Sequence, residues 1–339
     1  MAKVLLGMSG GMDSACAAKL LQAAGHEVIG ALLVMHEYTD ASGAQEAAEQ
    51  LGISLLTIDC RSVFEREVIA PFCAEYSRGK TPNPCILCNE QVKFASLLRE
   101  ADRLGCSYIA TGHYASLTEG EGGRLCIGRA LDEKKDQSYM LWRLPQESLR
   151  RVLFPLSDKV KSELRREARL GGLSAADKPE SQEICFIPDG DYASWIEHRT
   201  GRSFPPGDIV DGTGKIIGRH HGLIRYTIGQ RKGIGAYGKP MFVSAIDSEQ
   251  NRLVLSPAGG EYSDTLTVDS LLFSGILPFS GTRRFSVKLR YRASPVAASV
   301  TLEDEVAKVR LDAPARAVTP GQSAVFYEGS RVAFGGFIR

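Results

Sequence analysis

The residues best suited to chemistry are the six from Ser9 to Ser14, which read SGGMDS and stand between an apolar segment and an Ala/Leu-rich stretch. Gly10 and Gly11 let backbone N–H groups approach a phosphate closely, and the N-terminus of a following helix adds a positive dipole end. Ser9 and Ser14 add hydroxyl donors, and Asp13 is suited to hold Mg²⁺ against phosphates. The hexapeptide predicts a pyrophosphate cradle; the alternative is a glycine-rich turn without a ligand.

A kinase-type phosphate loop is not present in the sequence. The nearest approach to the pattern Gly-x4-Gly-Lys-Ser/Thr ends in Gly79-Lys80-Thr81, but Ala74 stands where the first glycine is needed.

The second reactive segment is Asn83-Pro84-Cys85-Ile86-Leu87-Cys88-Asn89. Asn83 is a good N-cap and Pro84 a good first helical residue, and apolar residues from Phe94 to Leu104 continue with helical spacing. Cys85 and Cys88 are therefore expected on one face of a first helical turn, where the helix dipole lowers the pKa of a thiol and favours the thiolate.

The other cysteines have less informative surroundings. Eight cysteines in a chain without an export signal are expected to be thiols, ligands or catalysts rather than a disulfide framework. Taken alone, Cys185 is predicted to be a buried core thiol. Packing is the expected role of Cys16, Cys60, Cys73, Cys106 and Cys126.

The elements that must position these residues alternate between strand and helix. Strands are expected at Lys3 to Met8, Glu27 to Met35, Ser54 to Asp59 and Tyr108 to Thr111, and helices up to Gly25 and at Gln45 to Leu51, Phe64 to Tyr76, Lys159 to Leu170 and Asp191 to His198. This alternation predicts a doubly wound α/β domain with a parallel sheet.

After about residue 200 the sequence changes to short alternating strands between Pro/Gly turns. A hairpin is expected at 208–218, and strands at 285–291, 298–302, 307–311 and 324–327 are typical of a small β-barrel. The predicted domains are 1–198 (α/β), 199–262 (small and β-rich) and 263–339 (C-terminal β-barrel).

Composition and charge set limits on the class of protein. The chain has 339 residues, 43% hydrophobic and 24% charged, and a net charge of +1, which is ordinary for a globular protein and gives no global nucleic-acid signature. Residues 199–240 nevertheless hold eight Lys/Arg against two acids, which indicates either a phosphate-binding face or a solvated basic surface. The apolar start breaks at Gly7 and no run reaches the ~18 apolar residues of a spanning helix, so a cytoplasmic location is expected.

The SGGMDS hexapeptide resembles the PP-loop of the N-type ATP pyrophosphatases. Members of that superfamily split ATP between the α and β phosphates and transfer AMP to a carbonyl oxygen. The resemblance implies ATP and Mg²⁺ as cofactors and adenylation as the chemistry.

Further segments occur in the order found in bacterial tRNA-specific 2-thiouridylases, which act on the wobble uridine. These segments are residues 83–89, 111–114, 135–138, 181–186, 222–235 and 290–292. The chain resembles this family over nearly its whole length, which implies a tRNA partner and a monomer.

The resemblance also implies roles for single residues. Cys88 matches the nucleophile and Cys185 the cysteine that carries a persulfide, while Leu33 and Gly112 match positions beside the adenine. The ATP loop is Gly7, Met8, Ser9, Gly10, Gly11, Met12, Asp13 and Ser14. The positions that match tRNA contacts are Asn83, Pro84, His113, Lys135, Asp136, Gln137, Arg290, Tyr291 and Gln322.

The implied reaction replaces the uridine 2-oxygen at tRNA position 34 with sulfur. Adenylation converts that oxygen into AMP, a good leaving group. Sulfur delivered to Cys185 by a cysteine desulfurase or a sulfur-relay protein then attacks the base, directly or after release as sulfide by Cys88, and leaves a Cys88–Cys185 disulfide to be reduced.

Cys85 departs from the family pattern, because many members carry aspartate there and use it for acid/base chemistry. A thiol can take that role only if its pKa suits the reaction. The three thiols of Cys85, Cys88 and Cys185 also raise the hypothesis of a [4Fe–4S] cluster with one open iron, used in place of a protein persulfide.

Two alternatives stay open at the level of sequence. One is a non-enzymatic RNA-binding module in which Cys85 and Cys88 hold a structural metal. The other is a PP-loop enzyme that adenylates a small molecule, which would need neither the Cys88/Cys185 pair nor a basic all-β extension.

Overall fold

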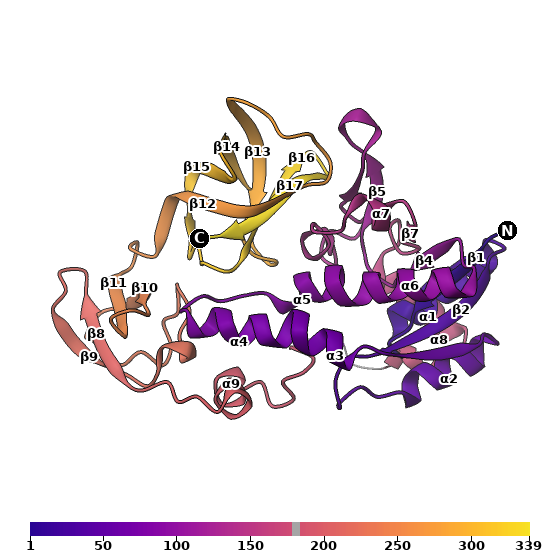
Figure 1. Cartoon of the computed structure of the whole chain (residues 1–339), viewed down its shortest axis with the longest axis horizontal. Helices are drawn as coiled ribbons and strands as arrows, with labels where there is room; N and C mark the ends of the chain where they lie inside the picture. Colours follow the sequence, from indigo (N-terminus) through magenta and orange to yellow (C-terminus); the bar gives the residue numbers. More distant parts are fainter. Residues whose placement is uncertain (178–183) are drawn as a thin grey trace.

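The computed structural model describes residues 1–177 and 184–339. It is an elongated molecule with three parts (Figure 1). A parallel sheet with its helices lies at one end, a small β-rich part lies at the other, and a β-barrel sits over the long helices between them.

The N-terminal part is built on five parallel strands in the order β3-β2-β1-β4-β7. Side chains of β1 alternate between two cores, with Leu6 facing helices α1, α2 and α8 and Leu5 facing α6. Helices on both faces confirm the predicted doubly wound α/β domain. The elements are β1 (Lys3–Gly7), α1 (Met12–Ala23), β2 (Glu27–Val34), α2 (Ser42–Leu51), β3 (Leu55–Asp59), β4 (Tyr108–Ala110), β7 (Val152–Leu153) and α8 (Lys161–Leu170).

Two long helices between β3 and β4 each contain a π-helical segment that the sequence pattern did not predict. The first runs through α3 (Arg61–Phe64), the π segment η1 (Glu65–Ile69) and α4 (Ala70–Ser77). The second runs through α5 (Pro84–Leu87), the π segment η2 (Cys88–Phe94) and α6 (Ala95–Leu104). The predicted helices are therefore confirmed, with a different internal geometry. Shorter helices are η4 (Ser138–Met140), α7 (Gln146–Leu149), η5 (Ser174–Asp177) and α9 (Tyr192–Thr200).

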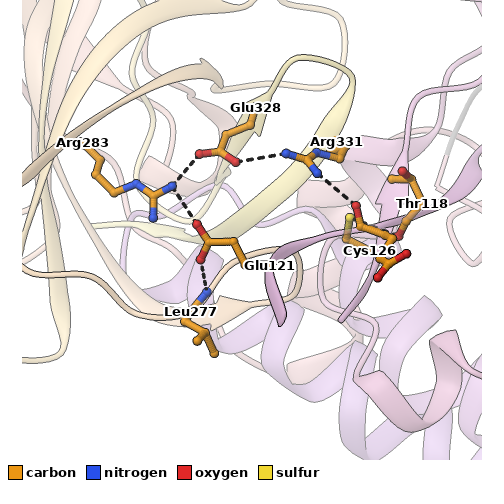
Figure 2. Close-up of polar contacts among 8 residues, drawn as sticks. Thr118, Glu121, Cys126, Leu277, Arg283, Glu328 and Arg331 are labelled. Atoms are coloured by element: carbon orange, nitrogen blue, oxygen red, sulfur yellow. Dashed lines mark hydrogen bonds and ion pairs between the residues drawn. The ribbon is translucent and has the colours of Figure 1, made fainter. Parts of the chain in front are cut away.

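A hairpin from the N-terminal part, β5 (Ser116–Glu119) and β6 (Leu125–Gly128), extends the sheet of the barrel through a pairing of β6 with β17. Figure 2 shows the polar contacts that accompany this pairing. Arg283 of the barrel donates to Glu121, in the short helix η3 (Glu121–Gly123) at the hairpin tip, at 3.0 Å and to Glu328 at 2.8 Å. Arg331 donates to the backbone oxygen of Glu119 at 3.0 Å. The two parts are joined by a shared sheet and not only by a linker.

The middle part is a four-stranded sheet in the order β10-β11-β8-β9. The predicted hairpin at 208–218 is present as β8 and β9, which pair antiparallel. The elements are β8 (Gly207–Asp211), β9 (Ile216–His220), η6 (Leu223–Arg225), β10 (Met241–Asp247) and β11 (Arg252–Pro257).

The C-terminal part is a six-stranded antiparallel barrel that closes through pairing of β12 with β17. Its core contains stacked phenylalanines, with the rings of Phe326 and Phe334 4.2 Å apart. The strand expected at 285–291 ends earlier, at Lys288, so Arg290 and Tyr291 lie beyond it in a turn. The strands are β12 (Tyr262–Phe273), β13 (Thr282–Lys288), β14 (Val296–Glu303), β15 (Val306–Arg316), β16 (Ser323–Glu328) and β17 (Arg331–Ile338).

Within the described ranges, every helix is too short or too polar to cross a membrane.

Candidate active site

The glycine-rich loop lies between β1 and α1, at the carboxyl end of the parallel sheet. Gly11 is the N-cap of α1 and makes no side-chain hydrogen bond to it, so the first N–H groups of the helix are left for another acceptor. The Ser14 hydroxyl donates to the Gly11 oxygen at 2.9 Å and accepts from the Ser9 N–H at 3.4 Å. These bonds hold the loop in a closed turn that suits an anion.

Two glycines are required by close backbone approach. Gly10 has φ +75°, and a Cβ there would lie 2.6 Å from backbone atoms of Gly43 and Ala44. Gly112, which follows β4, would place a Cβ 2.8 Å from the backbone of Asp13 and Ser14. Gly112 therefore packs directly on the loop, and its place beside the adenine stays a prediction.

The remaining residues of the predicted ATP site have mixed exposure. Gly7 ends β1, and Leu33 on β2 is partly buried between two apolar cores. Met8 and Met12 are buried, with 2% and 5% of their surface exposed. Their side chains serve the core, so only their backbone atoms can face a nucleotide.

Asp13 is already partnered by two residues that the sequence did not single out. Its carboxylate accepts from the Lys161 ammonium at 2.7 Å and from the Tyr114 hydroxyl at 2.9 Å. Lys161 is the first residue of α8. In the sequence, a lysine on such a polar helix is expected to be exposed to solvent. The predicted role of Asp13 as a Mg²⁺ ligand stays a prediction.

The three cysteines of interest come together from two distant segments. Cys88 is buried in an apolar cluster that includes Phe186 and Ile187, the residues after Cys185. Cys85 and Cys185 are exposed. The Cys88 thiol interacts electrostatically with both of the others and lies 3.7 Å from the Met35 sulfur. Residues 181–183 of the predicted Cys185 motif lie outside the described part of the chain.

Two expectations for these thiols were wrong. Burial raises the pKa of Cys88 to about 12, although its place near a helix start had predicted a lowered value. The loss of hydration at a buried thiolate outweighs the helix dipole. Cys185 is exposed rather than a core thiol, although partial desolvation still raises its pKa. Cys16, Cys60, Cys73, Cys106 and Cys126 are all buried, as their packing role predicted.

None of the eight cysteines, all in the described part of the chain, forms a disulfide. The Cys88–Cys185 disulfide is expected only after a turnover, so it stays a prediction. Among residues 1–177 and 184–339, no three His, Cys, Asp or Glu side chains are arranged to hold a metal ion. Cys85, Cys88 and Cys185 are within this range. In a [4Fe–4S] cluster each cysteine binds a different iron, so the cluster stays a prediction.

Lys93 is the residue of this site that the sequence missed. It belongs to the π segment η2 and interacts electrostatically with Cys85, Cys88 and Cys185. His113 faces the same lysine: burial and the Lys93 charge lower the pKa of His113 to about 3. The imidazole is therefore neutral, and it stacks on Phe94 with ring centroids 5.9 Å apart.

Asn83 and Pro84 begin the cysteine helix as predicted. The Asn83 side chain accepts from the Cys85 N–H at 3.1 Å, and Pro84 is the first helical residue. The Asn83 amide also donates to the Met140 sulfur at 3.3 Å. These contacts fix the start of the helix.

Two residues expected to contact tRNA have other uses in the structure. Asp136 is 7% exposed, and its carboxylate accepts from the N–H groups of Ala130 and Ser138 and from the Ser138 hydroxyl. The Gln137 side chain accepts from the Tyr114 N–H at 2.9 Å. Both side chains stabilise the segment that follows the hairpin, while Lys135 next to them is partly exposed.

The barrel residues that were expected to contact tRNA also interact with other residues of the protein. The Arg290 guanidinium donates to the Ile228 oxygen at 3.1 Å and to the Thr319 hydroxyl, and burial lowers its pKa. Gln322 donates to the Thr81 oxygen at 2.7 Å. The ring of Tyr291 lies 5.5 Å from the Lys288 ammonium.

A parallel α/β sheet with an uncapped glycine-rich loop after its first strand is the architecture of a nucleotide-binding domain, and here it is followed by a small β-rich part and a β-barrel. Three family descriptions match the chain: "tRNA methyl transferase HUP domain" over residues 2–189, "tRNA methyl transferase PRC-barrel domain" over 194–257 and "Aminomethyltransferase beta-barrel domain" over 263–338. The HUP match covers more than half of the chain.

Curated relatives give the particular family. A protein of Acetivibrio thermocellus named tRNA-specific 2-thiouridylase MnmA is 43% identical over 99% of this chain and 99% of its own length. A protein of the same name from Carboxydothermus hydrogenoformans is 42% identical over 99% and 97%. The chain belongs to the tRNA-specific 2-thiouridylase family, as the sequence resemblance predicted. Neither alternative, a metal-holding RNA-binding module or a small-molecule adenylating enzyme, gains support.

Among solved structures, a 4-thiouridine synthetase–RNA complex with bound ATP is 17% identical with a TM-score of 0.37, covering 59% of this chain and 50% of that one. This likeness is too low to carry an argument.

Proposed function

We propose that this protein catalyses the ATP-dependent 2-thiolation of the wobble uridine, position 34, of tRNA. The observation that carries the proposal is the packing of Cys88 with Phe186 and Ile187, the residues that follow Cys185, in a chain that also holds the glycine-rich loop. Family membership and the loop support adenylation, and the thiols support sulfur transfer. In this proposal, residues 1–198 form the catalytic domain and residues 263–339 bind the anticodon arm. Residues 199–262 form the small domain between them.

Adenylation takes place at the loop of residues 9–14. The uridine 2-oxygen attacks the α-phosphorus of ATP, and pyrophosphate leaves. The N–H groups at the start of α1 bind the phosphates, and the Lys161 ammonium is placed to neutralise their charge. Mg²⁺, where bound, would shield the phosphates.

Sulfur transfer follows on the activated base. Cys185 is exposed and accepts sulfur as a persulfide from a cysteine desulfurase or a sulfur-relay protein. The terminal sulfur attacks C2 of the uridine, AMP leaves, and Cys88 attacks the inner sulfur of Cys185. This forms the Cys88–Cys185 disulfide and releases the thiolated base, and an external dithiol reduces the disulfide.

The target base must leave its stack to reach the loop, at a cost of a few kcal/mol. We expect basic residues between Arg219 and Lys239 to contact phosphates, which would position the tRNA without reading its sequence. We expect the barrel to supply the remaining contacts with the tRNA.

The test is mass spectrometry of tRNA after reaction with ATP and a sulfur source. Wild type is expected to produce 2-thiouridine, whereas Cys88→Ala and Cys185→Ala are not. Cys106→Ala, which removes a buried thiol of the same domain, is the matched control. Full thiolation by Cys185→Ala would contradict the persulfide route.

A second measurement separates this function from adenylation of a small molecule. Pyrophosphate release is expected to be stimulated by tRNA and not by amino acids or free nucleotides. A rate of pyrophosphate release that is the same with and without tRNA would contradict the proposal.

A further inference from the structure

Asp13 lies in the first turn of α1, beside the N–H groups that the proposed phosphate site uses. A carboxylate in a first turn is attracted to those N–H groups, because they carry the positive end of the helix dipole and have no partner within the helix. Phosphates are attracted by the same groups. An unrestrained Asp13 side chain would therefore compete with the phosphates for the N-terminus of the helix.

The structure directs both oxygens of this carboxylate to other partners. The Asp13 Oδ1 accepts from the Tyr114 hydroxyl at 2.9 Å, and Oδ2 accepts from the Lys161 ammonium at 2.7 Å. The two donors also lie close to each other, with the ammonium 5.5 Å from the centroid of the Tyr114 ring. Hydrogen bonds to a charged acceptor are about twice as strong as neutral ones, so these two bonds compete effectively with the helix N–H groups.

Tyr114 is held firmly enough to act as a fixed donor. It is 2% exposed and packs in the core cluster that also contains residues of α1. Its backbone is bonded to Gln137 in both directions: the Tyr114 N–H donates to the Gln137 side chain at 2.9 Å, and the Gln137 N–H donates to the Tyr114 oxygen at 2.8 Å. Two residues earlier, Gly112 packs on the backbone of Asp13 and Ser14. The hydroxyl therefore reaches Asp13 from a rigid segment.

Lys161 fixes the charge of the pair, but it does not by itself fix the direction of the carboxylate. Its N–H donates to the Asp132 carboxylate at 3.0 Å, and its side chain is 12% exposed, so the start of α8 is well placed. A bond to one carboxylate oxygen leaves the other oxygen available for a further donor. The Tyr114 hydroxyl occupies that second oxygen and sets the orientation of Asp13.

We propose that the Tyr114 hydroxyl is a positioning group for ATP binding. Together with Lys161 it keeps the Asp13 carboxylate away from the N-terminus of α1, where the phosphates bind. The inference rests on the proposed function and adds a residue to its adenylation half. Tyr114 acts through Asp13 and makes no contact of its own with ATP.

The experiment measures the dissociation constant for ATP by equilibrium dialysis of the full-length protein in EDTA, so that no divalent cation contributes. Tyr114→Phe removes the hydroxyl and keeps the ring. We expect its dissociation constant for ATP to rise about 3- to 10-fold, because the released carboxylate oxygen competes with the phosphates. Adenosine, which has no phosphates, should bind as it does to the wild type.

Tyr139→Phe is the matched control. It removes a buried hydroxyl that donates to the Ser323 oxygen at 2.9 Å, the same distance as from Tyr114 to Asp13. The control is expected to lower the melting temperature about as much as Tyr114→Phe and to leave the dissociation constant for ATP unchanged. An equal loss of ATP affinity in both variants would indicate a general effect on the fold and would overturn the inference.

A double-mutant cycle separates positioning from packing. In Asp13→Ala there is no carboxylate to hold, so the addition of Tyr114→Phe should change the dissociation constant for ATP by less than about twofold. A further loss as large as that in the single variant would mean that Tyr114 acts independently of Asp13, and the inference would be wrong. An effect of Tyr114→Phe that appears only when Mg²⁺ replaces EDTA would also overturn it, because it would indicate a metal ion held by Asp13.

The two proposals fail separately. ATP binding requires neither tRNA nor a sulfur source. An ATP affinity that depends on Tyr114 through Asp13, in a protein that never thiolates tRNA, would contradict the proposed function alone. Normal thiolation by a protein whose ATP affinity does not depend on the Tyr114 hydroxyl would contradict only this inference.

Discussion

Replacing Asp136 by alanine tests whether this residue serves the fold or the tRNA. The carboxylate accepts from the N–H groups of Ala130 at 3.1 Å and Ser138 at 3.2 Å, and from the Ser138 hydroxyl at 2.7 Å. That hydroxyl in turn lies 3.1 Å from the Tyr327 hydroxyl on β16, so the network joins the catalytic part to the barrel. Ser138 has no exposed surface, which leaves little access for water to replace the lost acceptor.

The expected loss follows from these contacts. Hydrogen bonds to a charged acceptor contribute about 1.5–3 kcal/mol each, and bonds that share one carboxylate are not additive. We therefore expect Asp136→Ala to reduce the free energy of unfolding by about 3–5 kcal/mol. For a domain of the size of the N-terminal α/β part, this loss corresponds to a melting temperature lower by roughly 8–15 °C. Asp136→Asn keeps one oxygen acceptor for the N–H groups and should lose about half as much.

The assay pairs thermal unfolding with tRNA binding measured well below the melting temperature. The exposed Glu133→Ala is the control and should melt like the wild type. Asp136→Ala should bind tRNA normally once folded. A variant that melts like the wild type but loses tRNA affinity would refute the structural role and favour direct contact with tRNA.

Three further changes probe the site. Gln322→Ala removes the bond to the Thr81 oxygen and should slow thiolation about 2- to 10-fold with unchanged tRNA affinity, whereas a raised tRNA dissociation constant would favour direct contact. Arg290→Ala should weaken tRNA binding and reduce the slope of log affinity against log salt concentration by about the contribution of one phosphate contact. Unchanged affinity across a salt titration would contradict a phosphate contact. Lys161→Met removes the cation beside Asp13 and should raise the KM for ATP about tenfold or more in a pyrophosphate-release assay, and an unchanged KM would argue against phosphate binding by this lysine.

The features that could be predicted from the sequence depend on local signals. The parallel sheet follows from alternating apolar strands and amphipathic helices, and its first strand differs from the prediction by one residue. The loop of residues 9–14 and the N-cap at Asn83 follow from residue types whose backbone or side chain fits one local geometry. Such signals do not depend on what the rest of the chain does.

The features that were missed depend on tertiary contacts. Lys161 reaches Asp13 only because α8 packs on the same face of the sheet as α1, and nothing near residue 161 in the sequence indicates this. Lys93 reaches the thiols through a π-helical segment, whose apolar pattern cannot be distinguished from that of an α-helix. The raised pKa of Cys88 has the same origin, since its burial comes from Phe186 and Ile187 in a distant segment.

The start of the cysteine helix depends on all three parts of the molecule. The Thr81 N–H donates to the Pro320 oxygen at 2.9 Å, and its oxygen accepts from Gln322 in the same turn of the barrel. Gly321 between them has φ +88°, and a Cβ there would lie 3.1 Å from Lys80 and Thr81. On the other side, the Thr81 hydroxyl lies 3.4 Å from that of Thr227 in the middle part. Because Cys85 and Cys88 follow within the next seven residues, any tRNA that moves the barrel must also move the frame that holds the thiols.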